Sequence, residues 1–265
     1  MTFSSKILNN SPELKNKIIE IISQASSAIM EIYTKTDLGI NLKKDNSPVT
    51  EADLKANKII CKNLKALFPE VPIISEEESN SFADFQSSKM FWIIDPLDGT
   101  KEFINHKKEF TCNIALVEEG NPSFGFVSIP AKNLIYFGGK AYGSYLVNSD
   151  GKKSKINCKN YHSTIRIVAS KSHLNESTKT FINSIKEPYE LVQAGSSLKF
   201  IKIAEGKADL YPRLAPTCEW DTAAAQAILE GAGGSVKKIN GEDLKYGKVD
   251  VLNPYFVAKS NFINL

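Results

Sequence analysis

FWIIDPLDGT, at residues 91–100, joins a run of apolar residues directly to two aspartates. A short apolar run bounded by turn residues is typical of a buried strand, so the sequence predicts a strand over 91–94 that ends in Asp95 and Asp98. A proline stiffens the turn between the aspartates, and Gly99 lets the backbone approach an anion closely. Taken alone, the segment is as compatible with a plain Pro-x-Asp-Gly turn as with a metal site.

The metal-site interpretation rests on the oxygen atoms that this turn presents. Mg²⁺ takes oxygen ligands in an octahedron and seldom binds more than a few protein carboxylates. The turn can bring Asp95, the Leu97 carbonyl and Asp98 into one small volume. The backbone N–H groups that open the following helix would face a phosphate bound there. The combination favours a phosphate held by a cation.

Acidic residues elsewhere in the chain could belong to the same site as this segment. Another apolar run, 71–74, is followed by acids at 76–78, of which we expect two on a solvated face and one turned inward toward Asp95. Asp221 opens a helix, where an aspartate ordinarily serves as N-cap. Residues 50–53, TEAD, resemble a capping box that ends in Asp53. Each acid has an ordinary structural explanation, and their occurrence together favours a functional cluster.

The rest of the chain predicts an α+β half followed by an α/β half. In the first half, apolar periodicity predicts helices after Ser11 and from Thr50 to Phe68, and turn signals predict antiparallel hairpins between 110 and 147. In the second half we expect strands at 165–169, 190–193 and 208–211, and helices near 176–185, 198–204 and after Asp221. A boundary near 155–162 gives domains 1–158 and 159–265, with the site in the cleft between them.

The composition excludes some classes of protein. The 265 residues carry a net charge of +3, and their hydrophobic and charged fractions, 42% and 24%, are those of an ordinary globular chain. The lysines are scattered without a basic run, which does not favour a nucleic-acid polymer as partner. Only Arg166 and Arg213 are arginines, and a planar two-pronged donor such as Arg213 suits phosphate.

Cysteine usage and hydropathy bear on the compartment. Cys61, Cys112, Cys158 and Cys218 are far apart and form no C-x-x-C pair, so we expect reduced thiols rather than disulfides or a zinc site. No apolar run approaches the length of a membrane span. The expected compartment is the cytoplasm, and peripheral association with the inner face of a membrane stays compatible with the sequence.

The acidic segments also carry a resemblance to a known family. The motifs are VTEAD at 49–53, SEE at 75–77, DPLDGT at 95–100, and WDTAA at 220–224 with GAGG at 231–234. In this order they resemble the inositol monophosphatase superfamily of lithium-sensitive, magnesium-dependent phosphatases. The resemblance covers most of the chain and implies an α/β fold, the αβαβα layered sandwich of the inositol monophosphatase and sugar phosphatase type.

Three further segments look like one branch of that superfamily, the CysQ-type 3'(2'),5'-bisphosphate nucleotidases. They are KEFI at 101–104, GSSLKF at 195–200, and AEG at 204–206 followed by DLYPR at 209–213. The resemblance implies hydrolysis of the small phosphorylated nucleotide 3'-phosphoadenosine 5'-phosphate to AMP, which clears a by-product of sulfate assimilation. It leaves the number of Mg²⁺ ions (two or three) and the oligomeric state open.

The resemblance assigns roles to individual residues. One Mg²⁺ would be held by Glu76, Asp95 and the Leu97 carbonyl, and a second by Asp95, Asp98 and Asp221. A water molecule would attack the phosphate in line, with its proton accepted or directed by the Thr100 hydroxyl, which Asp53 orients. The metal ligands Glu76, Leu97, Asp98 and Asp221 would therefore also border the substrate.

The remaining substrate contacts would come from backbone and C-terminal residues. The N–H groups of Gly99 and Thr100 would hold the attacked phosphate. Ser196, Lys199 and Arg213 are candidates for the 5'-phosphate, although a helical lysine such as Lys199 is often a solvated surface residue. The histidines at 106, 162 and 173 lie outside all of these motifs, and we expect them on the surface.

Two rival interpretations remain open. The first is an enzyme of the same fold that acts on inositol phosphate, fructose 1,6-bisphosphate or histidinol phosphate. The second is a non-catalytic nucleotide or metal sensor that keeps the fold. Such a sensor would be expected to lose Thr100, Asp53 or a ligating acid, and all of these are present.

Overall fold

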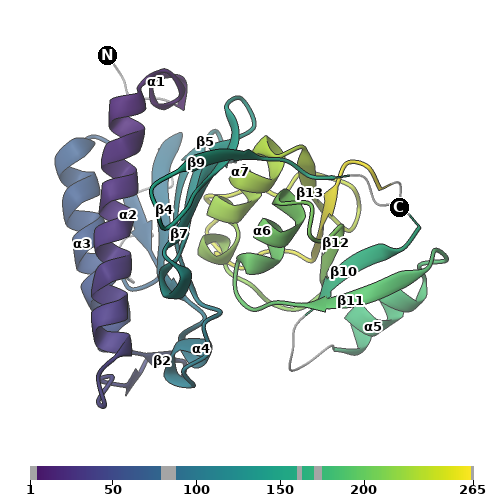
Figure 1. Ribbon diagram of the computed structural model, residues 1–265, viewed down its shortest axis with the longest axis horizontal. Helices are drawn as coiled ribbons and strands as arrows, with labels where there is room; N and C mark the ends of the chain where they lie inside the picture. The colour runs from purple at the N-terminus through teal and green to yellow at the C-terminus, as the bar shows by residue number, and fades with distance from the viewer. Residues whose placement is uncertain (1–4, 79–87, 160–162, 170–174, 264–265) are drawn as a thin grey trace.

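Two large sheets, with helices between them and on their outer faces, make up the fold. The computed structural model describes residues 5–78, 88–159, 163–169 and 175–263. Two long amphipathic helices, α2 (Pro12–Tyr33) and α3 (Glu51–Leu67), lie on the outer face of the first sheet (Figure 1). Ser11 caps α2 and Thr50 caps α3, as the sequence predicts. A short helix, α1 (Ser5–Asn10), precedes them.

The first sheet has its strands in chain order, and all neighbours are antiparallel except the first pair. The strands are β3 (Ile73–Ser75), β4 (Met90–Asp98), β5 (Thr111–Glu118), β6 (Asn121–Ile129), β7 (Leu134–Gly139), β8 (Gly143–Val147) and β9 (Lys153–Ile156). The predicted meander is thus present. Strand β9 was not predicted, because its exposed lysines show no apolar pattern.

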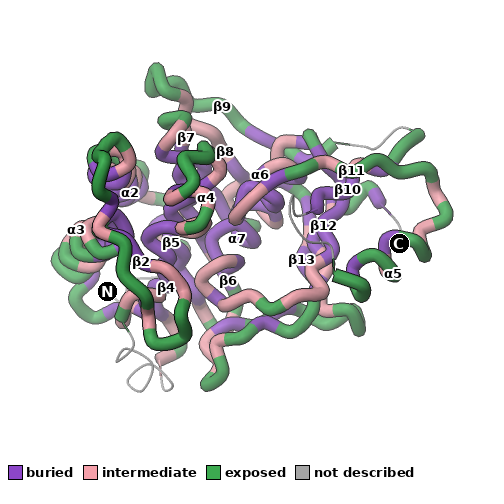
Figure 2. The backbone as a smooth tube through the Cα atoms, turned by 90° about the horizontal axis from the view of Figure 1, so that it is seen from below, coloured by how far each residue is buried: buried purple, intermediate pink, exposed green. Residues whose placement is uncertain are grey.

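Both faces of this sheet are buried. Successive side chains of a strand point to opposite faces, so one strand can contribute to two cores. In β4, Phe91 and Ile93 belong to the core shared with the second half of the chain. Trp92 and Ile94 belong to the core under α2 and α3. Figure 2 shows the buried segments concentrated in the sheets and on the helix faces between them. A continuous apolar run therefore marks a strand with helices on both sides.

The second sheet has the order β11-β10-β12-β14-β13. Its strands are β10 (Ile165–Ala169), β11 (Tyr189–Gln193), β12 (Leu210–Arg213), β13 (Gly234–Lys238) and β14 (Phe256–Ser260). Its helices are α5 (Glu176–Asn183), α6 (Leu198–Ala204) and α7 (Ala223–Gly231). Helices α6 and α7 lie between the two sheets and α5 lies on the outer face, which completes the αβαβα sandwich (Figure 1).

Helix α7 joins the two halves through unusually close packing on β6. A Cβ added at Gly125 would lie 2.1 Å from the carbonyl oxygen of Ala224, so only glycine permits this approach. One hydrophobic core runs from the first sheet through α6 and α7 to the second. The chain passes from one sheet to the other between Ile156 and Ile165, near the expected boundary. That 1–158 and 159–265 are separate domains stays a prediction.

The remaining elements are short. They are the hairpin β1 (Asn41–Leu42) and β2 (Pro48–Val49), the helix α4 (Thr100–Ile104), and the 3₁₀ turns η1 (Pro130–Lys132) and η2 (Glu219–Asp221). No helix in the described part of the chain combines the length and apolar character that crossing a bilayer requires.

Candidate metal centre and active site

The structure replaces the predicted turn after residue 94 with a bulged strand. Strand β4 continues to Asp98, with Asp95 opposite Asn113 and Asp98 opposite Thr111, so the register shifts between the two aspartates. On a regular strand, residues three apart point to opposite faces, and a bulge corrects this by one residue. The expected strand with the aspartates at its C-terminal end is present, but the backbone ladder resumes after a bulge where a turn was expected.

Three carboxylates from separate parts of the chain meet here. Oxygen atoms of Glu76, Asp95 and Asp221 all lie within 4.8 Å of one another. Glu76 follows β3, Asp95 lies in β4, and Asp221 ends η2. Asp98 lines a cavity of about 100 Å³ together with Asp221, Lys199 and Arg213. The acids that the sequence singled out are therefore brought together across both halves of the fold.

Each of the three aspartates has one carboxylate oxygen held by a backbone N–H. Leu97 donates to Asp95 Oδ1 over 3.0 Å, and Ser197 donates to Asp98 Oδ2 over 2.6 Å. Cys218 donates to Asp221 Oδ2 over 2.8 Å. These bonds fix the orientation of each carboxylate. The expectation that Asp221 caps the following helix was wrong: α7 begins at Ala223, and Asp221 closes the preceding 3₁₀ turn.

Burial gives these acids unusual electrostatics. Burial, with added repulsion from Glu76 and Asp98, raises the pKa of Asp95 well above its ordinary value. Burial also raises the pKa of Asp98 to about 6, against the opposing effect of Lys199. Burial and repulsion from Asp98 raise the pKa of Asp221 to about 8. Clustered carboxylates of this kind need a positive partner, and an all-oxygen donor set fits Mg²⁺.

Asp53 serves two neighbours with its two carboxylate oxygens. Its Oδ2 accepts from the N–H of Thr50 over 2.8 Å and from the Thr50 hydroxyl over 2.5 Å, which confirms the predicted capping box. Its Oδ1 accepts from the Thr100 hydroxyl over 3.2 Å. The same hydroxyl lies 3.2 Å from the Leu97 carbonyl oxygen. The capping box thus holds Asp53 in the orientation that reaches Thr100.

Sequence reasoning missed Lys43, on the β1–β2 hairpin. Its Nζ lies 2.7 Å from both Glu76 Oε1 and Glu77 Oε1. Burial alone would lower the pKa of Lys43, and the two ion pairs raise it above its ordinary value instead. Lys43 lies in a short polar turn, a pattern that predicts a solvent-exposed residue, so no local signal identifies its role.

The expectation for the acids at 76–78 needs correction. Glu77 turns inward as well as Glu76: the Glu77 side chain is only 5% exposed. Burial raises the pKa of Glu77 to about 7. Glu78 alone is exposed, and it accepts from the Asn57 amide over 3.0 Å. The shared contact with Lys43, which is not visible in the sequence, explains why two acids can be accommodated.

Ser197 is a second residue that sequence reasoning missed. Besides the N–H bond to Asp98, its hydroxyl lies 2.8 Å from the Thr111 hydroxyl and 3.0 Å from Asn113 Oδ1. Thr111 and Asn113 lie on β5, whereas Ser197 precedes α6. The contact therefore joins the two halves beside the acidic cluster. Its signal was the GSSLKF motif, which drew attention to Ser196 instead.

Ser196 packs directly against Gly99. The Ser196 hydroxyl lies 3.0 Å from the Asp98 carbonyl oxygen and 2.9 Å from that of Glu109. Gly99 has φ +94°, and a Cβ there would lie 2.3 Å from Ser196 Oγ, so glycine is required for both reasons. The Ser196 hydroxyl thus bonds to the protein itself, and its contact with substrate stays a prediction.

Lys199 and Arg213 both line the cavity that Asp98 and Asp221 also line. Lys199 is 7% exposed, with its Nζ 3.1 Å from the Ser196 carbonyl oxygen and above the Tyr211 ring, so the solvated alternative was wrong. Arg213 donates from Nε to the Ala215 carbonyl and from Nη2 to the Pro216 carbonyl, over 3.2 and 2.7 Å. These bonds hold the guanidinium at the cavity that Asp98 also lines.

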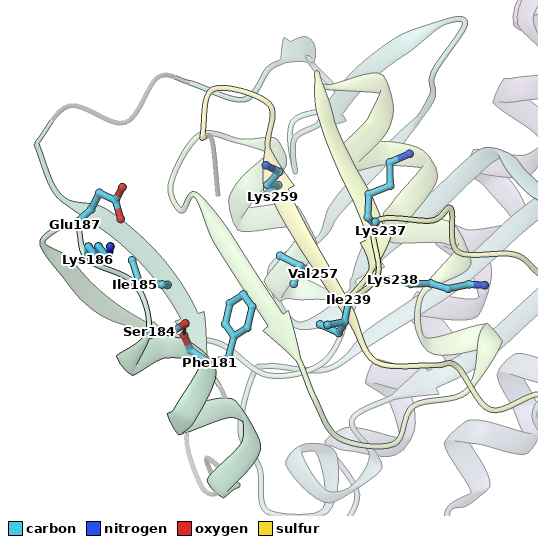
Figure 3. Close-up of a pocket in the computed structure, with 11 residues that line it drawn as sticks. Phe181, Ser184, Ile185, Lys186, Glu187, Lys237, Lys238, Ile239, Val257 and Lys259 are labelled. Carbon is cyan, nitrogen blue, oxygen red and sulfur yellow. Dashed lines mark hydrogen bonds between the residues drawn. The ribbon is translucent and has the colours of Figure 1, made fainter.

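Other candidate features lie outside this cluster. His106 is exposed, with its ring against Tyr33, as expected of a surface histidine. His162 and His173 lie outside the described residues. A cavity of about 570 Å³ opens between α5 and β14, on the outer side of the second sheet (Figure 3). It is roomier than the acidic site, but among the described residues that line it only Glu187 carries a carboxylate, so these residues offer no comparable metal chemistry.

The sequence pattern of the inositol monophosphatase family matches residues 8–263. This chain therefore belongs to the inositol monophosphatase family. A Thermotoga maritima inositol monophosphatase, 23% identical, has the same fold, with a TM-score of 0.76 over 96% of this chain and 94% of that chain.

More similar proteins share a single name. The 3'(2'),5'-bisphosphate nucleotidase CysQ of Buchnera aphidicola subsp. Acyrthosiphon pisum is 38% identical over 98% of both chains. The protein of the same name from Escherichia coli (strain K12) is 38% identical over 91% of this chain and 97% of its own. The crystal structure of CysQ from Bacteroides thetaiotaomicron, 37% identical, has a TM-score of 0.81 and covers 94% of this chain and 97% of that chain.

Proposed function

We propose that this chain is a phosphatase that hydrolyses the 3'-phosphate of 3'-phosphoadenosine 5'-phosphate to give AMP and phosphate, a 3'(2'),5'-bisphosphate nucleotidase. The observation that carries the proposal is one cavity lined both by the carboxylates Asp98 and Asp221 and by the cations Lys199 and Arg213. The carboxylates suit a cation-assisted reaction at one phosphate, and the two cations suit a second phosphate on the same substrate. The near-full-length similarity to proteins named CysQ supports this substrate class.

The proposed cofactor is Mg²⁺, as two or three ions. Glu76, Asp95 and the Leu97 carbonyl would hold one ion, and Asp95, Asp98 and Asp221 a second. The fit rests on the all-oxygen donor set and on the closeness of Glu76, Asp95 and Asp221 within 4.8 Å. When bound, such ions offset phosphate charge and lower the pKa of water, which makes it a better nucleophile.

The chain's own residues handle the proton and the phosphate. The Thr100 hydroxyl, bonded to Asp53 Oδ1 over 3.2 Å, would direct the proton of an attacking water. Asp53 cannot turn away without losing its bonds to Thr50. The N–H groups of Gly99 and Thr100 stand at the start of α4 and would bind oxygen atoms of the attacked phosphate.

Selectivity for a bisphosphate follows from the cationic side of the cavity. Lys199 and Arg213 would pair with the 5'-phosphate, because both are held at the cavity by bonds to backbone carbonyls. A sugar monophosphate offers no anionic group at that distance from the reacting phosphate. Its binding would leave both cations without a new partner, so it should be the poorer substrate.

The test is phosphate release with Mg²⁺ from a panel of substrates. The panel contains 3'-phosphoadenosine 5'-phosphate, 3'-AMP, inositol 1-phosphate, fructose 1,6-bisphosphate and histidinol phosphate. We expect the bisphosphorylated nucleotide to have the highest kcat/KM, by about tenfold or more over 3'-AMP, which lacks only the 5'-phosphate. An Asp98→Asn preparation controls for contaminating phosphatase. A higher kcat/KM for inositol 1-phosphate than for the bisphosphate would refute the proposed substrate.

We also propose a cytoplasmic location. Cys61, Cys112, Cys158 and Cys218 are all unpaired in the structure, and burial raises the pKa of the Cys112 and Cys158 thiols to about 12. Such protonated, buried thiols suit a reducing compartment. Free thiols in protein isolated under thiol-blocking conditions would support this location, and disulfides would argue against it.

A further inference from the structure

A loop from a later part of the chain forms hydrogen bonds with the segment that carries Asp221. Residues 247–253 lie between β13 and β14 and run along residues 217–219. The N–H of Glu219 donates to the Val251 carbonyl over 2.9 Å, and that of Asn253 donates to the Thr217 carbonyl over 2.8 Å. Cys218 and Leu252 form an antiparallel bridge between them. We call residues 247–253 the clamp loop.

Glu219 anchors this loop with a buried carboxylate that the proposed mechanism does not use. The residue is 1% exposed. Its carboxylate accepts from the N–H of Gly247 over 2.7 Å and from the N–H of Lys248 over 3.1 Å, and it pairs with the Lys248 ammonium. A buried charge is tolerated when it is paired and hydrogen-bonded in this way. Glu219 therefore ties the start of the clamp loop to η2.

Asn253 anchors the other end of the clamp loop. Its amide nitrogen lies 2.7 Å from the Cys218 carbonyl oxygen and 3.0 Å from the Thr222 hydroxyl. The same hydroxyl lies 3.0 Å from the Tyr246 hydroxyl. Asn253, Thr222 and Tyr246 are all buried, so these bonds have little competition from water.

The backbone of residues 217–219, which the clamp loop contacts, is also the backbone that orients Asp221. Cys218, bridged to Leu252 and bonded to Asn253, donates its N–H to Asp221 Oδ2. We propose that the clamp loop, anchored by Glu219 and Asn253, positions Asp221 for metal binding, an inference that rests on the proposed metal centre. Glu219 and Asn253 are thus positioning residues, which act through Cys218 on a ligand that no sheet ladder supports.

The test measures Mg²⁺ binding to the full-length, substrate-free protein by isothermal titration calorimetry. Glu219→Gln keeps the shape of the side chain and removes the charge that pairs with Lys248. We expect this variant and Asn253→Ala to bind Mg²⁺ about tenfold more weakly, as is typical when a group that orients a metal ligand is lost. Lys248→Met should have a smaller effect, because the two backbone N–H donors remain.

A matched control separates positioning from general loss of stability. Ile182→Val shortens a side chain buried in the core under α5, away from Asp221, and should lower Tm while leaving Mg²⁺ affinity unchanged. Lys238→Met removes an exposed ion pair with Glu242 and should change neither quantity. If Glu219→Gln and Asn253→Ala lower Tm like Ile182→Val but keep wild-type Mg²⁺ affinity, the positioning role is wrong.

The same titration distinguishes this inference from the proposed substrate. It contains no nucleotide, so it gives the expected result even if the substrate panel favours another phosphate ester. Absence of Mg²⁺ binding to the wild-type protein would overturn the positioning role together with the proposed metal centre.

Discussion

The acids of the first half and the acid of the second half are held in different ways. Asp95 and Asp98 lie in a strand of a seven-stranded sheet that pairs with β5 along most of its length and with β3 at residues 92–94. Asp221 ends a three-residue 3₁₀ turn and depends on contacts with residues 247–253. A sheet positions side chains through its regular ladder, whereas a turn needs tertiary partners. The first half thus supplies a rigid platform, and the second half completes it.

The two halves also oppose each other electrostatically. The carboxylate of Asp221, from the second half, contributes to the raised pKa of Asp95, and Asp98, from the first half, contributes to that of Asp221. The packing of α7 on β6 imposes this closeness. A cation between the halves would relieve the repulsion, so metal binding should also hold the halves together. Four experiments, in order of expected effect, test this comparison.

The largest effect is expected from Asp98→Asn in the platform. Loss of a metal charge should lower kcat by about 1000-fold or more, equivalent to about 4 kcal/mol in the barrier. Removal of a buried, repelled carboxylate should not unfold the protein and should raise the Tm of the metal-free form. Phosphate release at saturating Mg²⁺ and thermal denaturation measure the two effects. Wild-type activity in the variant would refute the metal assignment of Asp98.

A smaller effect is expected from Thr100→Val, which removes the hydroxyl bonded to Asp53 and keeps the side-chain shape. We expect kcat to fall by about 100-fold, as is typical when a proton-directing group is lost, with little change in Mg²⁺ affinity. Thr100→Ser, which keeps the hydroxyl, is the matched control and should retain most of the activity. Wild-type kcat in Thr100→Val would refute the proton-directing role of the hydroxyl.

The third experiment moves to the second half. Arg213→Ala should raise KM for 3'-phosphoadenosine 5'-phosphate by about tenfold, the loss of one charge-assisted contact, and leave kcat almost unchanged. KM for 3'-AMP should change much less, because that substrate has no 5'-phosphate. Equal increases for both nucleotides would remove Arg213 from the 5'-phosphate site. Arg166, paired with Asp209 on the second sheet, provides a comparison arginine outside the cavity.

The smallest effect is a pH dependence of stability. The pKa values of Asp98 and Asp221 in the folded protein, about 6 and about 8, lie above the 3.8 of an unperturbed aspartate. The folded state therefore binds more protons, and the stability from these groups is complete below about pH 3.8 and lost as pH rises toward 8.

Calorimetry with and without Mg²⁺ checks this sign. The Tm of the metal-free protein should fall by a few degrees between pH 6 and pH 8, about the change expected for 1 kcal/mol. Mg²⁺ should raise Tm more at pH 8 than at pH 6, because metal ligands must be deprotonated. Asp221→Asn should flatten the metal-free profile. A metal-free Tm that rises over this interval would contradict the electrostatic conflict between the halves.

Much of this arrangement was predictable from local sequence. The runs at 71–74 and 91–94 predict buried strands because both faces of a central strand need apolar residues. Thr50 and Asp53 predict a helix start because a capping box satisfies backbone donors within four residues. The acidic motifs, taken together, predict a metal centre of known kind. For the strands and the helix start, the physical cause lies within a few residues of the signal.

What the tertiary structure alone decided involves partners far apart in the chain. The bulge between Asp95 and Asp98 depends on the register with β5, and the burial of Glu77 depends on Lys43 from another hairpin. The Ser197 contact to Asp98 joins residues 99 positions apart. No local pattern encodes such contacts, because they exist only after distant segments of the chain have packed together. The sequence by itself determined which acids and strands form the site, and the packing determined how each carboxylate is oriented.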